Sequence, residues 1–556
     1  MSYIWADTKA LWLKCGYGEK ENAKRIPGAY FSKPKKAWKF SLDIMTFKAL
    51  CALFPDAEVD PDARDKILNL RNKYKRLIKA KSEILANPDP ELKNTLELPL
   101  FDHQHKSFAF YSVMDPSVDF SEPGAGKTAV QIALIKHRAI NHGIQKVLII
   151  CPLSLMITEL WKNEINRFFP QWSHPIITLD KSTDKAISEL KNHPNGGVFI
   201  INYEKTWRIR DLLVKYGFEM MIVDESSRIK NHAAKQSKAI HKISEGIRFK
   251  SILTGTPTPN SFMELFSQMK VVDPMLFGSS FYTFRERFFK KDDWDEFNWT
   301  PKPKTESQIK QMIDVYAMSW KKDECLDLPP LTTQIMSCKL SIEQRKAYEQ
   351  MSMWMIAVLE DYDHAAFEAN IILTKILRLC QITSGFIQNT DGAGHTVFKS
   401  NPKLDLLMSI LEEIPTDRKI IVWAVFQQDI RSIVGKVGKT AVSYYGGNSK
   451  KINQTNIGNF KTDPACKVLV ANPRSAGMGL DLSCASYSIY FSMSYSFEDY
   501  AQSRERFNRT GQKHPMTEYI LTATNTMDGV ILDAVMNKKK INDFVTTVKK
   551  HIKSEA

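Results

Sequence analysis

Ser121-Glu-Pro-Gly-Ala-Gly-Lys-Thr128 is the strongest local signal in the chain. Gly124 and Gly126 let the backbone come close to phosphates and turn its N–H groups toward them. Lys127 can reach the terminal phosphates of a nucleotide, and the Thr128 hydroxyl can ligate Mg²⁺. The usual first glycine of such a loop is a serine here. The alternative to a phosphate-binding loop is a Gly-rich turn that only caps a helix. Together with the acidic pair described next, the loop predicts a nucleotide phosphate site at the start of a helix.

A second signal is the run Met220-Met-Ile-Val-Asp224-Glu225, an apolar strand that ends in two acids. In a parallel sheet, ligands bind at the carboxyl ends of the strands. Asp224 can hold the Mg²⁺ shell, and Glu225 can orient or deprotonate the attacking water. Such a pair alone is usually a solvated turn, but its place after a phosphate loop in the same lobe favours catalysis.

Short apolar runs around these motifs indicate the fold. Four lie in the first half of the chain and three near its end, at 147–151, 197–202, 220–224, 251–254, 419–424, 467–471 and 487–491. Fully apolar strands separated by amphipathic helices indicate parallel sheets covered on both faces. The chain is therefore predicted to be an α/β protein with two parallel-sheet lobes. The predicted parts are a small α+β unit (1–60), a helical linker (61–98), a first lobe (99–275), a helical insertion that connects the lobes (276–400) and a second lobe (401–556).

The composition narrows the class of protein. The 556 residues include 77 Lys and Arg against 62 Asp and Glu, and this net charge of +15 favours a polyanionic partner. With 43% hydrophobic residues the chain can bury real cores, which excludes a largely disordered protein. The longest apolar run, 147–157, is too short for a membrane span. The eight cysteines show neither C-x-x-C nor finger spacing, so the sequence predicts no zinc site, no disulfide framework and a reducing compartment.

A cluster of arginines lies near the end of the second lobe, in Gln502-Ser-Arg-Glu-Arg506-Phe-Asn-Arg509-Thr-Gly-Gln512. Arg504, Arg506 and Arg509 are expected on a helix that ends at Gly511. An ATP hydrolase that closes two lobes needs an arginine from the far lobe, because charge builds up on the γ-phosphoryl group. The alternative is a solvated or DNA-facing surface, but the phosphate loop elsewhere in the chain favours the catalytic interpretation.

Over about 99–535, these stretches resemble the superfamily-two helicases, and among them the Swi/Snf-type translocases of double-stranded DNA. The acidic motif reads Asp224-Glu-Ser-Ser-Arg-Ile-Lys-Asn231, with two serines where the family carries a small residue and a histidine. Leu253-Thr-Gly-Thr-Pro257 and Arg474-Ser-Ala-Gly-Met-Gly-Leu-Asp-Leu482 resemble two further motifs, and the arginine cluster resembles the last one. Gln512, where many helicases carry Arg, is typical of the translocase branch.

The resemblance implies two RecA-like lobes that bind ATP and Mg²⁺ between them. It implies catalytic roles for Lys127, Asp224, Glu225, Arg506 and Arg509, and metal ligation by Thr128 and Asp224. It places nucleotide contacts on Gln104, Gly124, Ala125, Gly126, Lys127, Thr128, Gly479, Asp481 and Gln502. It places DNA contacts on Thr254, Arg474 and Ser475.

The N-terminal unit shows a second resemblance, to the HARP domain of annealing helicases, in the stretch from Ile26 to Phe40. Lysines alternate there with aromatic residues, and the predicted DNA contacts are Lys33, Lys35, Lys36, Trp38 and Lys39. Lysines can neutralise phosphates while aromatic rings stack on exposed bases at a junction. The alternative, weighed equally, is a small domain with aromatic core residues and solvated lysines, because Trp38 and Phe40 fall on one strand face.

The sequence thus predicts a DNA-dependent ATPase whose two lobes close over ATP and ratchet along duplex DNA. The HARP-like start suggests branch migration, fork reversal or strand annealing on duplex, forked or four-way DNA, in replication, recombination or repair. The alternatives are an RNA helicase and a non-enzymatic DNA-binding regulator switched by ATP. We expect a monomer that binds neither a membrane nor zinc and that can work together with a single-strand-binding protein. The expected location is the cytoplasm of a bacterium or phage-infected cell, or the nucleus of a eukaryote.

Overall fold

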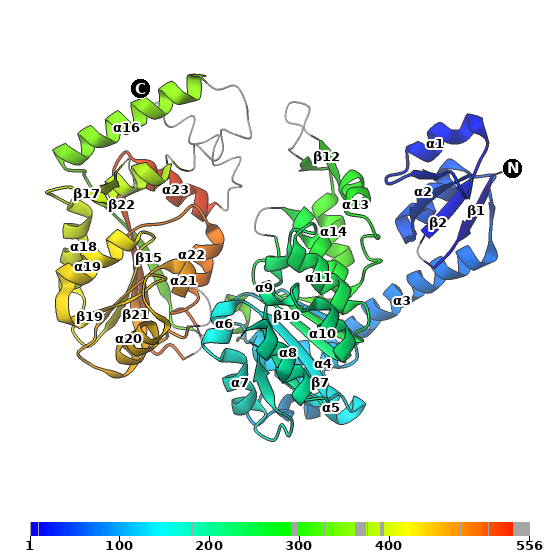
Figure 1. Cartoon of the computed structure of the whole chain (residues 1–556), viewed down its shortest axis with the longest axis horizontal. Helices are drawn as coiled ribbons and strands as arrows, with labels where there is room; N and C mark the ends of the chain where they lie inside the picture. The colour runs from blue at the N-terminus through cyan, green and yellow to red at the C-terminus, as the bar shows by residue number, and fades with distance from the viewer. Residues whose placement is uncertain are drawn as a thin grey trace. The chain divides into compact units, whose positions relative to one another are not determined.

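A computed structural model gives the fold, and it describes residues 2–8, 10–179, 182–258, 261–291, 299–326, 328–361, 374, 376–389, 394–476, 480–509 and 511–537. The chain divides into two compact units, Met1–Cys325 and Leu326–Ala556 (Figure 1). Within the described ranges, no helix is both long and apolar enough to cross a bilayer.

The N-terminal part of the first unit is a five-stranded sheet with helices on one face. Its strand order is β3-β4-β2-β1-β5, for β1 (Tyr3–Ala6), β2 (Ala10–Lys14), β3 (Tyr30–Ser32), β4 (Ala37–Ser41) and β5 (Glu58–Val59). The core joins the strands to three helices, α1 (Lys20–Lys24), α2 (Ile44–Leu53) and α3 (Pro61–Ala86), through residues such as Leu11, Phe40, Ala23, Leu50 and Ile67. Phe40 is buried and Trp38 packs half-buried on the same core, so the two share a face as predicted.

The first lobe is built on a seven-stranded sheet whose neighbouring strands are all parallel. Its order is β14-β6-β11-β10-β7-β9-β8, for β6 (Pro116–Asp119), β7 (Lys146–Cys151), β8 (Ile176–Thr178), β9 (Gly197–Asn202), β10 (Met220–Asp224), β11 (Phe249–Leu253) and β14 (Ala317–Met318). The β7 residues from Val147 to Cys151 are fully buried, which explains the unbroken apolar run of this strand.

Helices of the first lobe lie around this sheet (Figure 1). The longer ones are α4 (Asp102–Ser112), α5 (Lys127–His142), α7 (Leu160–Phe168), α8 (Thr183–Asn192), α10 (Arg210–Tyr216), α11 (Lys235–Ser244), α12 (Leu265–Val272), α13 (Phe281–Phe288) and α14 (Thr305–Asp314). Shorter elements are α6 (Leu153–Ile157), α9 (Tyr203–Thr206), α15 (Lys322–Cys325) and the hairpin of β12 (Phe289–Lys291) and β13 (Trp299–Pro301).

The second unit carries another all-parallel sheet, in the order β15-β22-β21-β18-β20-β19. Its strands are β15 (Leu331–Cys338), β18 (Lys419–Trp423), β19 (Ala441–Tyr444), β20 (Val468–Ala471), β21 (Ala485–Tyr490) and β22 (Met516–Ala523), and a hairpin joins β16 (Phe386–Gln388) to β17 (His395–Val397). The helices are α16 (Ile342–Asp361), α18 (Pro402–Glu413), α19 (Gln427–Val437), α20 (Lys450–Thr462), α21 (Pro473–Ala476), α22 (Phe497–Arg504) and α23 (Met527–Met536). The chain is thus an α/β protein with two RecA-like parallel-sheet lobes, as predicted.

The stretch 276–400, expected to be a helical insertion between the lobes, is shared by the two sheets. Its strand β14 extends the sheet of the first unit, and its strand β15 forms the edge of the sheet of the second. The boundary between the compact units therefore falls inside this stretch, after Cys325. The remaining limits of the five-part division stay predictions.

A buried ion pair joins the N-terminal sheet domain to α13 of the first lobe. The Arg287 guanidinium donates to both carboxylate oxygens of Asp43 at 3.1 Å, and the two side chains are 9% and 7% exposed. The same guanidinium donates to the Thr46 hydroxyl, and Asp43 also caps α2 by accepting from the Thr46 backbone N–H at 2.8 Å. The N-terminal domain is therefore docked on the lobe as well as tethered by α3.

We expect Arg287→Ala to weaken this docking by about 3–5 kcal/mol, because it leaves the buried Asp43 carboxylate without its partner. Hydrogen exchange in residues 30–55 should rise in the variant, whereas Lys290→Ala, which removes an exposed cation nearby, should leave it unchanged. Equal protection in both variants would show that the pair contributes nothing. A truncation of residues 1–60 would leave Arg287 in the same unpaired state.

A buried carboxylate in the second unit makes stability depend on pH. Asp429 is 2% exposed and accepts from the hydroxyls of Ser492 at 2.7 Å and Ser384 at 3.3 Å. Burial raises the pKa of Asp429 to about 7, against about 3.9 in the unfolded chain. Asp429 therefore adds its full contribution to the free energy of unfolding below pH 4, and this contribution is lost as the pH rises toward 7.

We therefore expect Asp429→Asn to stabilise the second unit at pH 8 relative to wild type, by up to about 4 kcal/mol, and to have little effect near pH 4. Denaturant unfolding of both proteins at the two pH values measures this difference. A stability difference that does not change with pH would contradict it.

Candidate active site

The phosphate loop has the backbone geometry that the sequence predicts. The loop joins β6 to α5, and Gly124 and Gly126 take positive φ values of 87° and 83°. Gly126 is the N-cap of α5, so no side chain competes for the first N–H groups of the helix. A Cβ at Gly126 would lie 1.9 Å from Gln104 Nε2, so this position has no room for a side chain.

Gln104 lies directly against this loop, at the start of α4. Its amide Nε2 donates to the Ala125 carbonyl at 3.3 Å, and its Oε1 accepts from the Phe101 backbone N–H at 3.0 Å. The His103 ring also contacts the Ala125 carbonyl, with 2.8 Å from Nε2 to the oxygen. The structure brings Gln104 to the nucleotide loop, and its contact with a base stays a prediction.

Lys127 folds over the loop that precedes it. Its ammonium donates to the carbonyl oxygens of Ser121 at 2.6 Å and Glu122 at 3.1 Å. Asp119, at the end of β6, is buried beside it and accepts from the Ser121 backbone N–H at 3.0 Å. Burial raises the pKa of Asp119, and the Lys127 charge opposes the rise. Sequence reasoning missed Asp119, although an acid between a strand and a phosphate loop was a usable signal.

Asp224 ends β10 and is half-buried. Burial, and next the neighbouring Glu225 charge, raise the pKa of Asp224 to about 7, while the Trp161 hydrogen bond and Lys127 oppose the rise. Trp161 donates its indole N–H to Asp224 Oδ2 at 3.0 Å, and the Tyr203 hydroxyl donates to the Asp224 carbonyl at 2.6 Å. A half-buried carboxylate with a raised pKa is stabilised in its charged form by a nearby cation.

The donor set fits Mg²⁺. One carboxylate, Asp224, and one hydroxyl, Thr128, are the groups that Mg²⁺ takes when phosphates and water complete its octahedron. In the described part of the chain, no group of three or more His, Cys, Asp or Glu could hold a metal without such help. A bound Mg²⁺ would supply neutralisation of phosphate charge at this edge of the sheet.

Glu225 takes a strained backbone conformation next to Asp224. Its φ is 56°, in the left-handed region that non-glycine residues rarely adopt, and such strain clusters at functional sites. The Thr254 hydroxyl donates to Glu225 Oε2 at 3.3 Å and accepts from the Thr256 backbone N–H at 3.2 Å. Thr254 is fully buried by this arrangement, and the DNA contact predicted for it stays a prediction.

The loop after β11 also touches the phosphate loop. A Cβ at Gly255 would lie 2.4 Å from Pro123 Cδ, which shows how closely the two loops approach. Ser226, one of the two serines in the acidic motif, donates to Gln268 Oε1 at 2.8 Å, and Gln268 Nε2 donates to the Pro257 carbonyl at 2.7 Å. A polar chain through Gln268 therefore connects the acidic motif to this loop, and sequence reasoning did not single out Gln268.

We expect Glu225→Gln to bind ATP normally and to lower kcat at least about 10²-fold, because the change keeps the shape and removes the charge that positions or activates water. Steady-state hydrolysis and binding of a fluorescent nucleotide separate the two effects. Loss of nucleotide binding would instead assign Glu225 a structural role.

In the second unit, the structure brings Asp481 and Arg509 together. Arg509 Nε lies 3.8 Å from Asp481 Oδ1. Burial raises the pKa of Asp481, but the Arg509 charge and the hydrogen bonds from Ser483 together outweigh burial, so the pKa is lower than usual. Arg506 donates from Nε to the Gln502 carbonyl at 3.1 Å, and its own carbonyl accepts from the Leu482 backbone N–H at 2.9 Å. The last two helicase-like motifs thus form one hydrogen-bonded cluster.

Other predicted residues of this unit lie around the cluster. Gln502 is buried on α22, and its Nε2 donates to Glu498 Oε1 at 3.3 Å. Arg474 is exposed on α21, and the neighbouring Ser475 is half-buried. Gly479 lies outside the described residues. The structure does not test the nucleotide and DNA contacts predicted for these residues.

Arg504, the third arginine, has a structural partner. It lies 3.5 Å from the fully buried Glu518, which also accepts from the Tyr500 hydroxyl at 2.9 Å and the Thr333 hydroxyl at 3.0 Å. This network fixes α22 to the edge strand β15 and its neighbour β22, so Arg504 holds the helix that precedes the predicted catalytic arginines.

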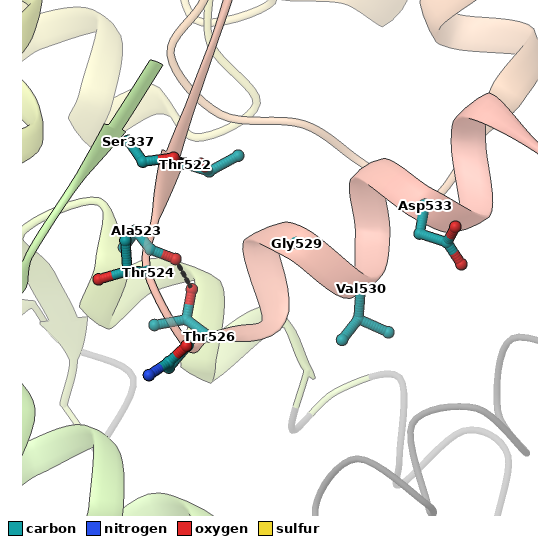
Figure 2. A pocket seen from close by; sticks show the side chains of 9 residues that line it. Ser337, Thr522, Ala523, Thr524, Thr526, Gly529, Val530 and Asp533 are labelled. Carbon is teal, nitrogen blue, oxygen red and sulfur yellow. Dashed lines mark hydrogen bonds between the residues drawn. The ribbon is translucent and has the colours of Figure 1, made fainter. Parts of the chain in front are cut away.

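A cavity of about 420 Å³ lies elsewhere in the second unit, at the ends of β15 and β22 and the start of α23 (Figure 2). Ser337, Thr522 and Thr526 are among the residues that line it (Figure 2). The Thr526 hydroxyl donates to the Ala523 carbonyl at 2.7 Å. None of the predicted site residues is among its lining residues.

Models of two known protein families match the two lobes. Residues 119–385 match the family model of the SNF2-related domain, and residues 402–511 match that of the helicase conserved C-terminal domain. The DNA repair and recombination protein RDH54 of Saccharomyces cerevisiae is 26% identical over 502 residues, which cover 81% of this chain and 53% of that protein. An uncharacterized ATP-dependent helicase of Mycoplasma pneumoniae is 25% identical over 427 residues, covering 76% of this chain and 39% of its own length.

A solved structure, the Sulfolobus solfataricus SWI2/SNF2 ATPase core in complex with dsDNA, is 23% identical with a TM-score of 0.39, and the match covers 82% of this chain and 94% of that one. This chain spans about half the length of the yeast relative. The family models define the class of protein, a superfamily-two helicase-type ATPase. Within that class, the chain belongs to the Swi/Snf-type family.

Proposed function

We propose that this protein is an ATP-driven DNA translocase that acts on duplex or branched DNA in replication, recombination or repair. One observation carries the proposal: the phosphate loop with Lys127, the acidic pair Asp224–Glu225 and the Thr254 loop are connected at one edge of a parallel sheet. This is the arrangement that ATP hydrolysis requires, since one loop binds phosphate and a carboxylate beside it serves metal and water.

The predicted site residues each have a defined role in this proposal. Lys127 and the first N–H groups of α5 bind the phosphates, and Thr128 and Asp224 would hold Mg²⁺. Glu225, oriented by Thr254, either accepts a proton from the attacking water or orients that water. Arg506 and Arg509 stabilise the charge that develops on the γ-phosphoryl group.

The preference for branched DNA rests on the N-terminal domain, with its HARP-like stretch and its lysine-rich hairpin. The names of the yeast relative and of the archaeal complex, which refer to DNA repair and to dsDNA, support DNA as the polymer. We propose a monomer in a bacterial, phage-infected or nuclear compartment, with a single-strand-binding protein as a further partner.

Stimulation of ATP hydrolysis by nucleic acids tests this function. Linear duplex, forked and four-way DNA, single-stranded DNA and duplex RNA are compared in one assay, together with strand displacement. We expect the largest stimulation from DNA that contains duplex. Stimulation by RNA alone would favour an RNA helicase, and DNA binding without turnover would favour an ATP-switched regulator.

A further inference from the structure

One face of the N-terminal sheet carries a row of aromatic and basic side chains. Trp5 on β1 pairs directly with Trp12 on β2, Trp12 pairs with Lys39 on β4, and Lys39 pairs with Tyr30 on β3. Directly opposite residues point to the same face of a sheet. Trp5, Trp12, Lys39 and Tyr30 therefore form one line across four strands, which we call the aromatic row.

The rings of this row are arranged as a stack with cations beside it. Trp5 lies parallel to Trp12, with centroids 6.1 Å apart and planes at 14°, and Tyr3 stacks on Trp5 at 5.8 Å. The ammonium of Lys35 lies 3.9 Å above the Trp12 ring, and that of Lys39 lies 5.9 Å away. Tyr30, at the other end, is 67% exposed, whereas Trp12 is 5% exposed and lies beside the half-buried Trp5 on the neighbouring strand.

The helices of the domain pack on the opposite face. Their buried residues, Ala23, Leu50 and Ile67, belong to the core that contains Phe40. The buried residues that surround the aromatic row, Ala10 and Ala37, come from strands alone. In the described ranges, therefore, no helix contributes a buried apolar residue to the side of the sheet that carries the row.

The charge beside the row favours a polyanion at one end. The turn between β3 and β4 carries Lys33, Lys35 and Lys36, all exposed, and Lys39 is exposed within the row. One acid lies beside these lysines: Asp7 accepts from the Trp12 indole N–H at 2.8 Å and pairs with Lys35 at 3.4 Å, so it offsets one of their charges. Glu58 and Asp60 lie at β5, at the opposite edge of the sheet.

We propose that the aromatic row binds single-stranded nucleic acid. Bases stack on Tyr30 and Trp5, and Lys39 with the lysines of the β3–β4 turn neutralises the phosphates between them. Stacking on aromatic rings beside a basic groove is how proteins hold unpaired strands without regard to sequence. The proposal deepens the proposed function, on which it rests, by naming the site that engages the unpaired strand of a branched substrate. Trp38, predicted to stack on DNA, lies on the other face and takes no part.

Binding of a short labelled oligothymidylate to the full chain, followed by fluorescence anisotropy without nucleotide, tests this site. Tyr30→Ala and Trp5→Ala should each weaken binding at least about fivefold, and Lys39→Ala should weaken it and flatten its salt dependence. The matched controls are Phe31→Ala, a 44% exposed ring on the opposite face, and Tyr17→Ala, an 83% exposed ring outside the sheet. Both controls should bind within about twofold of wild type.

Tyr30→Ala removes an exposed side chain, so its effect is independent of folding, and Trp5→Phe checks Trp5 with a ring retained. An oligouridylate arm shows whether the row takes RNA as well as DNA. Wild-type affinity in Tyr30→Ala, or an equal loss in Phe31→Ala, would overturn the site. Duplex-stimulated ATP hydrolysis is measured in the same variants and should persist. Its absence in wild type would contradict the proposed function, whatever the oligonucleotide result.

Discussion

Replacing Lys127 with alanine should reduce ATP hydrolysis to background, a loss of at least about 10³-fold, while DNA binding survives. The ammonium of Lys127 donates to the Ser121 and Glu122 carbonyls, so it lies over the loop that is proposed to bind the terminal phosphates. DNA contacts of a translocase are spread over many phosphates, and the loss of one lysine in the phosphate loop should not change them.

The measurement is steady-state hydrolysis with saturating duplex DNA, alongside DNA binding by anisotropy. Lys136→Ala is the matched control, because it removes a lysine from the same helix, α5, without touching the loop. Near-normal turnover in Lys127→Ala would reject the assignment of the phosphate loop. Loss of both hydrolysis and thermal stability in Lys127→Ala would instead show that the loop needs this lysine to fold.

The parts of the site that the sequence predicted are those whose chemistry is local. A glycine loop before a helix and two acids after an apolar strand each suggest a function within a few residues, so Gly126, Lys127 and Asp224 could be proposed as site residues without a structure. The partners Trp161, Tyr203 and Gln268 could not be predicted, because they come from separate segments that only the folded sheet brings together.

The fold shows the same contrast. The central strands, buried on both faces, read as unbroken apolar runs and were predicted. Strand β14 has only two residues, and β15 is an edge strand with several exposed side chains, so neither gave such a run and 276–400 was predicted to be helical. In the N-terminal domain, the alternation of Trp38 and Phe40 was visible, but the pairing of Trp5 with Trp12 and Lys39 depends on strand order, which the sequence did not reveal.

The second large effect should come from the arginines of the second unit. We expect Arg509→Ala to lower kcat by about 10³–10⁵-fold and to change ATP affinity far less, because the guanidinium acts mainly on the charge of the transition state. Arg506→Ala should behave similarly. Asp481, 3.8 Å from Arg509, holds that guanidinium in the free protein, so Asp481→Asn should lower kcat by a smaller factor.

Three further variants separate catalysis from structure. Arg431→Ala removes an exposed arginine from α19 and should leave hydrolysis unchanged. Arg504→Ala breaks the contact with the buried Glu518, so it should lower the thermal midpoint of the second unit together with its activity. Arg509→Lys keeps the charge but loses the planar fork, and it should recover only part of the rate. If Arg506→Ala and Arg509→Ala both hydrolyse ATP normally with duplex DNA present, these arginines are not the catalytic ones. In that case, a fall in kcat in Arg504→Ala without a loss of stability would move the assignment to Arg504.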